Sequence, residues 1–594
     1  MRSRRRRAGD RPRRTGRPTS RARDRRIGCA RSSTSRFPER SRTRAGHGCG
    51  AAVALHHRGL PRCQRLGEPV QLGERHAIIP SMFGHFRHTG PRLAVVALSC
   101  FSLTTCRRLY RFEGERLAHT YCAACHMFPE PALLDKQTWR TGVLPQMALR
   151  LGAPTKSLFT EMHREPAMVV LTKAVSQPDW EKIAGYYLEQ APDTLPQPSL
   201  PAQPQLDPPL FTAGPFVPRL QSSAIITLLK TDSVNARIFV GEAASNTLRV
   251  FDFNRRLEAS LTLSSPPTDV ISEKDRVLVL ESGRLEPNDE PKGTLAQYDV
   301  ARDGSFHFAK ILIDSLFRPV FVRDFDFAGH GHKDYVICEF GNNRGRLALY
   351  REEGGSYRRH VLDATPGAIR FEILDLTGDG FPDIVALFAQ GEERIMLFPN
   401  DGTGDFSGQS KVLARFPPIY GSMYFTLRDF NGDGKPDILY VNGDNWDYSR
   451  VLKPYHGIRI LENDGHNDFT ERYFFPIYGA AQAVVADFDK DGDLDILTTS
   501  NFADSARHPE RGIMYFENVG LYQFKPYAFS IASGNQWNVM ATADLNRDGW
   551  PDVLVGAMHL EDIASIQRRF RGPTLHTAVE PILLFENRGS TVRR

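Results

Sequence analysis

The chain has few cysteines for its length, and its clearest apolar run is short. Only 8 of its 594 residues are Cys, so we expect no disulfide framework. Five of them precede residue 107 and two belong to one short motif. The eighth, Cys338, lies in an apolar stretch, where we expect a buried free thiol. The apolar run at 93–106 is too short to span a bilayer as a helix.

Lysine is absent from the first 81 residues, which hold 22 Arg and 5 acidic residues. The rest of the chain carries 54 basic and 64 acidic residues, so its body is acidic although the formal net charge of the whole is +7. A nucleic-acid-binding function would rest on this arm alone, and we expect no nucleic-acid partner. The arm has no apolar periodicity. We expect residues 1–81 to be disordered and to lie upstream of the true start.

A secretory signal is predicted at residues 82–106. Met82 is a candidate start, and Arg87 and Arg92 precede the apolar run at 93–106. Basic residues followed by a short apolar segment are typical of an export signal, so we expect a periplasmic or cell-surface protein. The run ends at Cys106 in Leu-Thr-Thr-Cys, which loosely resembles the lipobox of bacterial lipoproteins. A lipid anchor on Cys106, ordinary cleavage and an uncleaved anchor remain the alternatives.

A five-residue motif, Cys122-Ala-Ala-Cys-His126, carries the clearest chemistry of the N-terminal part. Two thiols three residues apart can form thioethers with the haem vinyl groups, while His126 reaches the iron. A redox dithiol would require a thioredoxin-like βαβ context, and a zinc site would require a second ligand pair. Neither is present. We therefore predict covalent attachment of haem c at Cys122 and Cys125.

The module around this motif is predicted to be helical and to span residues 107–193. Residues 111–121 are expected to form a helix that leads into the motif. A second helix is predicted at 179–190, where Trp180, Ile183, Tyr187 and Leu188 recur at helical spacing. Residues Ser176 to Asp179 are expected to cap it.

The sixth ligand of the haem iron is predicted to be Met147. Its thioether would raise the reduction potential, and the flanking Leu residues would shield the haem face from water. Met162, His163 and Met168 are the alternatives. We further expect the loop with Pro129 and Pro131 to contribute the carbonyl that orients the imidazole.

A Pro-rich linker at 194–216 is predicted to separate this module from a repeat region at 217–594. In the repeat region an Asp-rich nine-residue unit recurs, with starts 54, 58 and 57 residues apart, each followed by an apolar strand. A degenerate copy begins at Asp324. Two further units without the loop fit before it, around 236–252 and 276–299. About four strands per unit is the size of a propeller blade, and the count predicts seven blades.

The Asp-rich units have the chemistry of calcium loops. Carboxylate or amide oxygens at positions 1, 3 and 5, a Gly at 6 and an Asp at 9 form the flexible oxygen shell that Ca²⁺ prefers. We expect calcium mainly as a brace of each blade, with calcium-regulated binding as the alternative. At the Asp324 loop calcium binding is left open, with His330 and His332 expected to be surface residues. The predicted ligands are Asp375, Thr377, Asp379, Asp383, Asp429, Asn431, Asp433, Asp437, Asp487, Asp489, Asp491, Asp495, Asp544, Asn546, Asp548 and Asp552.

At these loops the sequence resembles the FG-GAP/VCBS repeat proteins, whose propellers are like the head of the integrin α chain. The resemblance implies a seven-bladed propeller with calcium held by the loops, although the Phe-Gly and Gly-Ala-Pro signatures are eroded here. The N-terminal module resembles bacterial class I cytochrome c domains fused to such propellers, through the segments 121–126 and 183–188. The predicted fold class is thus a small all-α cytochrome c domain followed by an all-β seven-bladed propeller.

Three functions remain open at this point. The first is an exported electron-transfer protein whose propeller binds a redox partner, a membrane oxidoreductase, or a glycan or other cell-surface ligand. The second is an oxidoreductase whose propeller binds a sugar, an alcohol or an organic cofactor and passes electrons to the haem. The third is adhesion with the haem as a redox sensor. No Ser/His/Asp set or phosphate-binding Gly loop supports a complete enzyme, so we favour electron transfer.

Overall fold

The computed structural model describes residues 112–153, 175–218, 220, 225–444, 449–559 and 580–589. The chain divides into two units, 1–87 and 88–594, and every described residue belongs to the second. The predicted arm at 1–81 and the predicted signal at 82–106 lie outside the described residues. Among the described residues, no helix has the length and apolarity needed to span a membrane.

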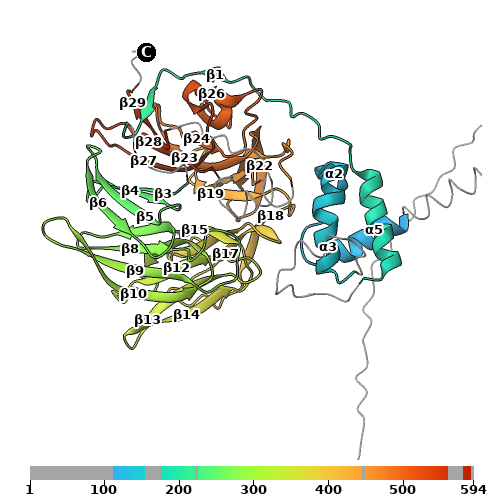
Figure 1. Ribbon diagram of the computed structural model, residues 1–594, viewed down its shortest axis with the longest axis horizontal. Helices are drawn as coiled ribbons and strands as arrows, with labels where there is room; N and C mark the ends of the chain where they lie inside the picture. Colours follow the sequence, from blue (N-terminus) through green and yellow to red (C-terminus); the bar gives the residue numbers. More distant parts are fainter. Residues whose placement is uncertain are drawn as a thin grey trace, which may run out of the picture. The chain divides into compact units, whose positions relative to one another are not determined.

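The N-terminal described region is a small helical unit (Figure 1). Helix 112–122 leads into the Cys motif, as the sequence predicts. Helix α5 (Gln177–Gln190) confirms the second predicted helix, and the Ser176 side chain caps it by accepting a hydrogen bond from the Asp179 amide. Between these lie the remaining helical elements, which are η1 (Pro131–Leu133), α2 (Lys136–Thr138), η2 (Trp139–Val143) and α3 (Leu144–Arg150).

The core of the helical unit is built from aromatic and aliphatic side chains of helix 112–122, η2, α3 and α5. Trp139 and Tyr187 are 1% exposed, and their rings lie 4.4 Å apart between centroids. Ile183 and Leu117 complete this core from α5 and helix 112–122, and Cys122 belongs to the same cluster. The apolar spacing of α5 thus buries one helical face, as expected for an amphipathic helix.

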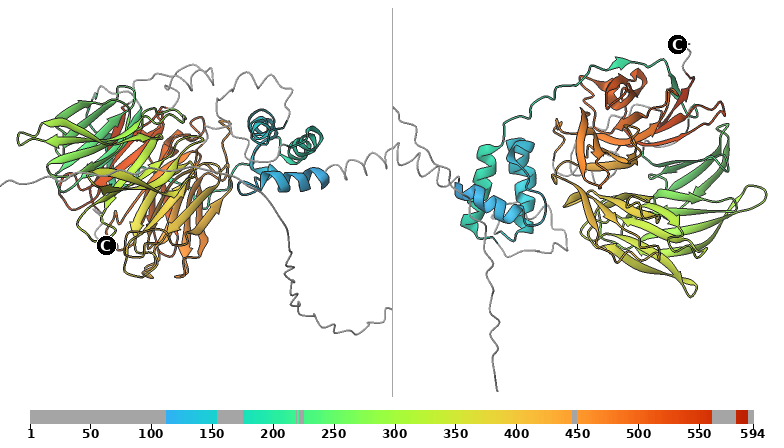
Figure 2. Two further views of the ribbon diagram at one scale, coloured as in Figure 1. Left: turned by 90° about the horizontal axis from the view of Figure 1, so that it is seen from below. Right: turned by 180° about the vertical axis from the view of Figure 1, so that it is seen from behind.

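The rest of the described chain forms seven antiparallel sheets of a β-propeller (Figures 1 and 2). The first three blades are β3 (Ile226–Asp232), β4 (Arg237–Glu242), β5 (Thr247–Asp252) and β6 (Leu257–Thr262); β7 (Pro267–Ser272), β8 (Arg276–Glu281), β9 (Gly293–Val300) and β10 (Phe306–Leu316); and β11 (Pro319–Phe325), β12 (Asp334–Glu339), β13 (Arg346–Glu353) and β14 (Ser356–Asp363).

The later blades repeat this pattern and confirm the predicted count of seven. They are β15 (Ala368–Leu374), β16 (Asp383–Phe388), β17 (Glu393–Phe398) and β18 (Lys411–Phe416); β19 (Ser422–Arg428), β20 (Asp437–Asn442), β21 (Gly457–Asn463) and β22 (Phe469–Pro476); β23 (Ala480–Ala486), β24 (Asp495–Ser500), β25 (Ile513–Asn518) and β26 (Phe524–Ala528); and β27 (Trp537–Ala543), β28 (Asp552–Ala557) and β29 (Ile582–Asn587). Two short 3-10 helices, η3 (Pro509–Gly512) and η4 (Ser530–Ala532), lie beside blade six.

The ring is closed by a strand that precedes the first blade in the sequence. Strand β2 (Phe211–Pro215) pairs antiparallel with β29 and completes the seventh blade. Strand β1 (Gln205–Leu206) pairs parallel with β26 and adds a fifth strand to the sixth blade. Both lie within 194–216, which the sequence analysis treats as linker, so the propeller begins earlier than residue 217. Closure leaves no open inner edge on the ring.

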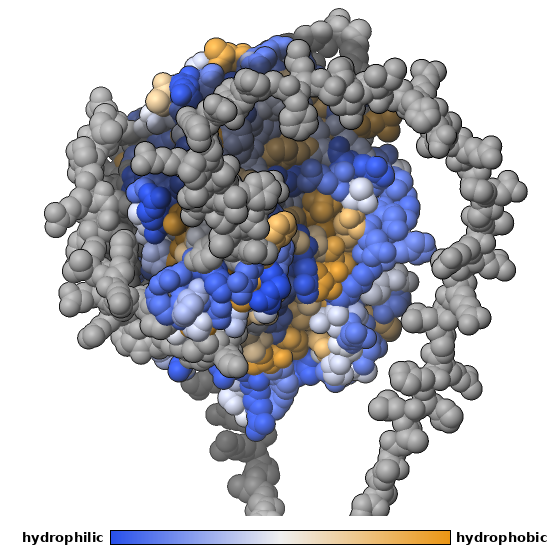
Figure 3. Space-filling view, turned by 90° about the vertical axis from the view of Figure 1, so that its right-hand side faces the viewer, coloured by the Kyte–Doolittle hydropathy of each residue, from blue (hydrophilic) through white to orange (hydrophobic). Residues whose placement is uncertain are grey.

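Burial falls from the second strand of each blade to the outermost strand. Strands β16, β20, β24 and β28 are buried at every residue, whereas the outer strand β14 is mostly exposed. Second strands are therefore near-continuous apolar runs, because neighbouring blades cover both of their faces. Cys338, in β12, is buried and unpaired, as predicted. On the face drawn in Figure 3 the described surface is mainly hydrophilic, with apolar residues gathered in recesses.

Candidate metal and haem-attachment sites

The four Asp-rich loops occupy the same place in four consecutive blades. Each connects the first strand of its blade to the second, as the loop from Asp375 to Asp383 does between β15 and β16. Because equivalent connections in a propeller emerge on the same side, these loops share one face of the ring. The loops that begin at Asp429, Asp487 and Asp544 follow the same rule.

The backbone of each loop needs two residues with positive φ. At position 6 this is always Gly, with φ of 90° at Gly380. At position 4 the loops use Gly or a basic residue, and Lys490 and Arg547 have φ of 58° and 61°. Glycine adopts this region without steric cost, whereas a side chain there is strained. The sequence analysis identified the Gly at position 6 but not the special conformation at position 4.

The first Asp of each loop binds the backbone of its own loop. In the Asp375 loop, the two carboxylate oxygens accept hydrogen bonds from Gly378 N at 2.7 Å and Gly380 N at 2.8 Å. Asp429, Asp487 and Asp544 accept equivalent bonds from the amide at position 6. These bonds from the first Asp to loop amides hold each loop in a tight turn.

The ninth Asp is buried and ties the loop to the outer part of its blade. Asp383 is 0% exposed; its Oδ2 accepts bonds from Leu376 N and Thr377 N, and its Oδ1 accepts one from Asn400 N at 3.0 Å. Oδ1 of Asp437, Asp495 and Asp552 is bound in the same way by the amides of Asn463, Asn518 and Asn587.

These four Asn residues are structural positions that the loop motif alone does not reveal. Asn400 accepts bonds from Gly402 N and Gly404 N through its side-chain oxygen, and so forms the turn after the third strand. The recurring signal in the sequence is Asn-x-Gly at the end of that strand, which is the pattern of an Asx turn. The ninth Asp therefore braces the blade through protein contacts alone. In Asp383 these three hydrogen bonds leave one lone pair, on Oδ1, for a cation.

The Asp487 loop concentrates the most negative charge. Single oxygens of Asp487, Asp489 and Asp491 all lie within 4.8 Å of one another. Burial and then the neighbouring carboxylates raise the pKa of Asp489, and the same causes raise the pKa of Asp493 to about 6. Asp493 Oδ1 is buried without a hydrogen-bond partner. Clustered carboxylates that repel one another fit a divalent cation, and hard oxygen ligands fit Ca²⁺.

In the degenerate loop at Asp324, the side chain of Lys333 supplies a positive charge. Lys333 Nζ lies 2.6 Å from Asp324 Oδ2 and 3.3 Å from Glu273 Oε1. An ammonium group thus neutralises the carboxylate that would begin a metal shell. His330 and His332 in this loop are exposed, as the sequence analysis expects.

The Cys motif lies at the C-terminal end of helix 112–122. Cys122 is buried, Cys125 is exposed, and both thiols are free. Burial raises the pKa of Cys122 to about 11. His126 is partly buried, which lowers the pKa of its imidazole. The three side chains of the motif therefore span the boundary between the core of the helical unit and solvent.

The hydrogen bond of His126 fixes which of its nitrogens is free. His126 Nδ1 lies 2.8 Å from the Met127 carbonyl oxygen. A carbonyl can only accept, so Nδ1 carries the proton, and Nε2 of the neutral ring keeps a lone pair. This is the tautomer that a metal-binding imidazole adopts, with its second nitrogen held by the protein. The donor set of Cys122, Cys125 and His126 fits haem c.

The loop after the motif is fastened to the helices by two proline carbonyls. Tyr187 OH donates to the Pro129 carbonyl at 3.1 Å, and Trp139 Nε1 donates to the Pro131 carbonyl at 2.8 Å. The carbonyl that binds the imidazole is thus that of Met127, while Pro129 and Pro131 position the loop.

Met147 lies in α3, partly buried, and packs against the core cluster that contains Cys122. Its role as a haem ligand stays a prediction. The alternatives Met162, His163 and Met168 lie outside the described residues.

The family model of the FG-GAP-like repeat matches residues 375–440. The chain contains an FG-GAP-like repeat. The matched segment takes in the Asp375 and Asp429 loops, so the repeat lies within the seven-bladed propeller. No curated protein matches the chain.

Two solved structures are similar to part of the chain. The Dos1 propeller matches at 11% sequence identity with a TM-score of 0.36, over 61% of this chain and 77% of that chain. Regucalcin from Agrobacterium tumefaciens, described as a calcium-binding protein, matches at 14% identity with a TM-score of 0.33, over 55% of this chain and 99% of that chain.

Proposed function

We propose that this chain is an exported electron-transfer protein, in which a c-type cytochrome module precedes a calcium-braced propeller that binds a partner or a surface. The observation that carries the proposal is the Cys122-x-x-Cys125-His126 motif with the His126 Nε2 lone pair left free. Export supplies the compartment in which haem is attached to such motifs. The partner is a redox protein or a membrane oxidoreductase, and a glycan or cell-surface ligand is the alternative.

The residues of the helical unit have distinct roles in this proposal. Cys122 and Cys125 would hold the haem through thioethers, and His126 and Met147 would bind its iron. The haem supplies reversible one-electron chemistry. The Met127 carbonyl orients the imidazole through Nδ1, and Trp139 and its neighbours exclude water from the interior.

Calcium in the four loops would stabilise the blades and take no part in the redox chemistry. Positions 1, 3, 5 and 9 of each loop would supply the side-chain oxygens, and the buried ninth Asp is hydrogen-bonded to the end of the third strand of the blade. The Asp487 loop is the strongest candidate because of its three adjacent carboxylates. Rigid blades would keep the binding surfaces between loops in a fixed arrangement.

The attachment of haem is tested with a pair of cysteine substitutions. Cys122→Ala with Cys125→Ala should abolish haem staining on a denaturing gel, because no thioether can form. Cys338→Ala is the matched control: this thiol is buried far along the chain in β12 and should leave staining unchanged. Covalent haem that persists in the double variant, or a wild-type chain exported without haem from a haem-attaching host, would contradict the proposal.

A further inference from the structure

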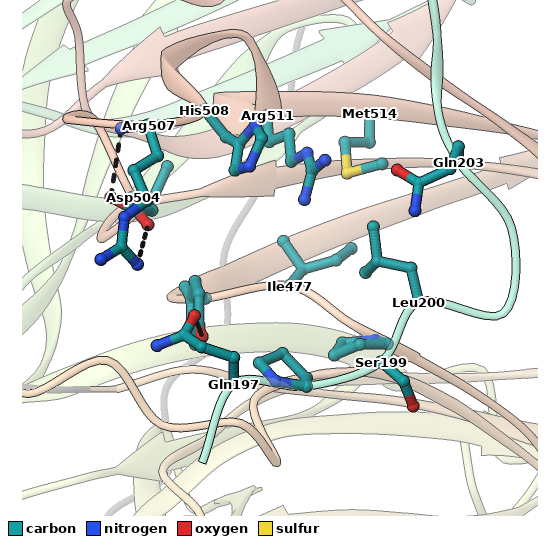
Figure 4. A pocket seen from close by; sticks show the side chains of 14 residues that line it. Gln197, Ser199, Leu200, Gln203, Ile477, Asp504, Arg507, His508, Arg511 and Met514 are labelled. Carbon is teal, nitrogen blue, oxygen red and sulfur yellow. Dashed lines mark hydrogen bonds and ion pairs between the residues drawn. The ribbon is translucent and has the colours of Figure 1, made fainter. Parts of the chain in front are cut away.

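A cavity of about 440 Å³ lies on the propeller, and neither the Asp loops nor the Cys motif contributes to its lining. One wall is the segment 197–203, which precedes β1. The other walls are the turn between β22 and β23 and the connection between β24 and β25 (Figure 4). Tyr478 OH donates a 3.0 Å bond to Gln197 Oε1 and joins the two sides.

Arg511 is the charged group best placed to bind a ligand here. Its guanidinium points into the cavity between Met514 and Ile477 (Figure 4). Its Nε is buried without a hydrogen-bond partner, and the ion pair found for it among the described residues is a long one, to Glu510 at 3.8 Å. A planar guanidinium with unused donors matches a carboxylate, which it can bind through two parallel hydrogen bonds.

The second arginine of the cavity, Arg507, is mostly exposed to solvent. Arg507 Nη1 lies 3.7 Å from Asp504 Oδ2, and its side chain is 65% exposed. The Asp504 carboxylate also accepts a bond from the Arg507 backbone amide. The Arg511 side chain is 22% exposed, so its guanidinium is the more enclosed of the two cationic groups in the cavity.

The remaining lining alternates apolar and hydrogen-bonding groups. Leu200 and Ile477 face the cavity from opposite walls, and the amide of Gln203 and the hydroxyl of Ser199 lie beside them (Figure 4). A pyranose ring has apolar C–H faces and hydroxyl edges, which this combination suits. The volume is in the range of small-ligand sites and holds one or two sugar residues.

We propose that this cavity binds a carboxylated sugar, a uronate, with Arg511 as the anchor of its carboxylate. The same chemistry occurs in a free monosaccharide and at the end of an acidic polysaccharide. The site is lined by the propeller and the segment 197–203, with no residue of the helical unit, so it goes beyond the proposed electron-transfer function and does not depend on haem attachment.

The test is calorimetric titration of the full-length protein with glucuronate, using glucose as the neutral counterpart. We expect saturable binding of glucuronate and at least tenfold weaker binding of glucose, because glucose lacks the carboxylate. Arg511→Gln should weaken glucuronate binding by roughly tenfold or more. Arg511→Lys should give an intermediate loss, since it keeps the charge but not the planar fork. An oligogalacturonide that binds more tightly than galacturonate identifies the polymer end as the source, and equal binding identifies the free sugar.

Arg507→Gln is the matched control, an arginine of the same cavity whose side chain is 65% exposed; it should change binding by less than about threefold, because exposed charges contribute little. Unchanged thermal unfolding of each variant shows that the fold is retained. Absence of glucuronate binding, equal binding of glucose, displacement by inorganic phosphate at equal concentration, or wild-type affinity in Arg511→Gln would each overturn the assignment.

Discussion

The Met127 carbonyl controls the chemistry of the neighbouring imidazole through the backbone alone. Because it accepts from His126 Nδ1, the lone pair of the neutral ring is at Nε2. The side chain of Met127 has no part in this contact and is 38% exposed. Met127 therefore acts on His126 through its backbone carbonyl, and its thioether sulfur takes no part in this hydrogen bond.

Met147→Ala tests the sixth ligand. Loss of the thioether should remove the Met–iron charge-transfer band and lower the reduction potential, since Met ligation raises it. Met127→Ala, which keeps the backbone carbonyl, should leave both unchanged. If the spectrum of Met147→Ala equals that of the wild type, Met147 is not the ligand, and Met162, His163 or Met168 takes its place.

Single carboxylates differ in role within the same nine-residue loop. Asp383 and its three counterparts are held by backbone amides on two sides, so they are needed for the blade even without metal. Asp489 is held in this way by one amide only, from Asp491, and lies among other carboxylates. Substitution at position 9 should therefore lower the stability of the fold with or without calcium. Substitution at position 3 should lower it only when calcium is present, because it weakens calcium binding.

At the scale of the blade, the Asp487 loop gives the sharpest test of calcium binding. Calcium at about 100 times its Kd stabilises a protein by about 2.7 kcal/mol for one site. Asp489→Asn should weaken calcium binding to this loop by roughly tenfold, because one ligand charge is lost. The measurement is the rise of Tm during calcium titration of EDTA-treated protein.

The control for this experiment is Asp326→Asn in the degenerate loop. Asp326 accepts bonds from His330 N and Gly331 N, and the first Asp of this loop, Asp324, already pairs with Lys333. Its substitution should leave the calcium-dependent rise of Tm intact. A wild-type Tm that does not respond to calcium would contradict the role of the loops as metal braces.

Neighbouring blades are also joined by a buried acid, Glu393. It accepts bonds from Gly421 N and Ser422 N of the next blade, and burial raises its pKa to about 7 from 4.5. Between these pH values the folded chain keeps a proton that the unfolded chain releases. The contribution of Glu393 to the free energy of unfolding is thus complete below pH 4.5. It is lost as pH rises to 7, a change on the order of 3 kcal/mol.

This pH dependence is measured as the urea midpoint of Glu393→Gln relative to the wild type. The wild type should lose stability relative to the variant as pH rises from 4.5 to 7, and the difference should be constant above that range. Glu392→Gln is the control, since Glu392 pairs with Arg394 and Arg415 near the surface. If the urea midpoints of the wild type and Glu393→Gln change in parallel with pH, Glu393 is not the titrating group.

At the scale of the whole molecule, the repeat in the sequence predicts the blade count but not which strand closes the ring. The loops recur at blade length, so seven blades follow from spacing. Closure pairs 211–215 with 583–587, a contact that no local pattern encodes. Strand β2 also contains Gly214 and Pro215, which mask a strand signal; as an outermost strand it tolerates them because its outer edge needs no partner.

Some features of the candidate sites could be predicted from the sequence, and others could not. The Cys motif, α5 and the positions of the Asp loops could be predicted because each is a local pattern of fixed spacing. The carbonyl partner of His126, the Asn residues that hold the ninth Asp and the Lys333 cation could not, since they depend on groups brought together by folding. The cavity around Arg511 is of this second kind, because segments 197–203, 476–478 and 503–514 meet only in the ring.

The account rests most on the haem in the helical unit, and a redox-titrated absorption spectrum of the exported full-length protein tests it most directly. We predict the bands of a thioether-linked, low-spin haem that is reduced and reoxidised reversibly in a single one-electron step. A purified, exported and folded protein without haem absorbance, or with haem that an acidic organic solvent extracts, would contradict the account.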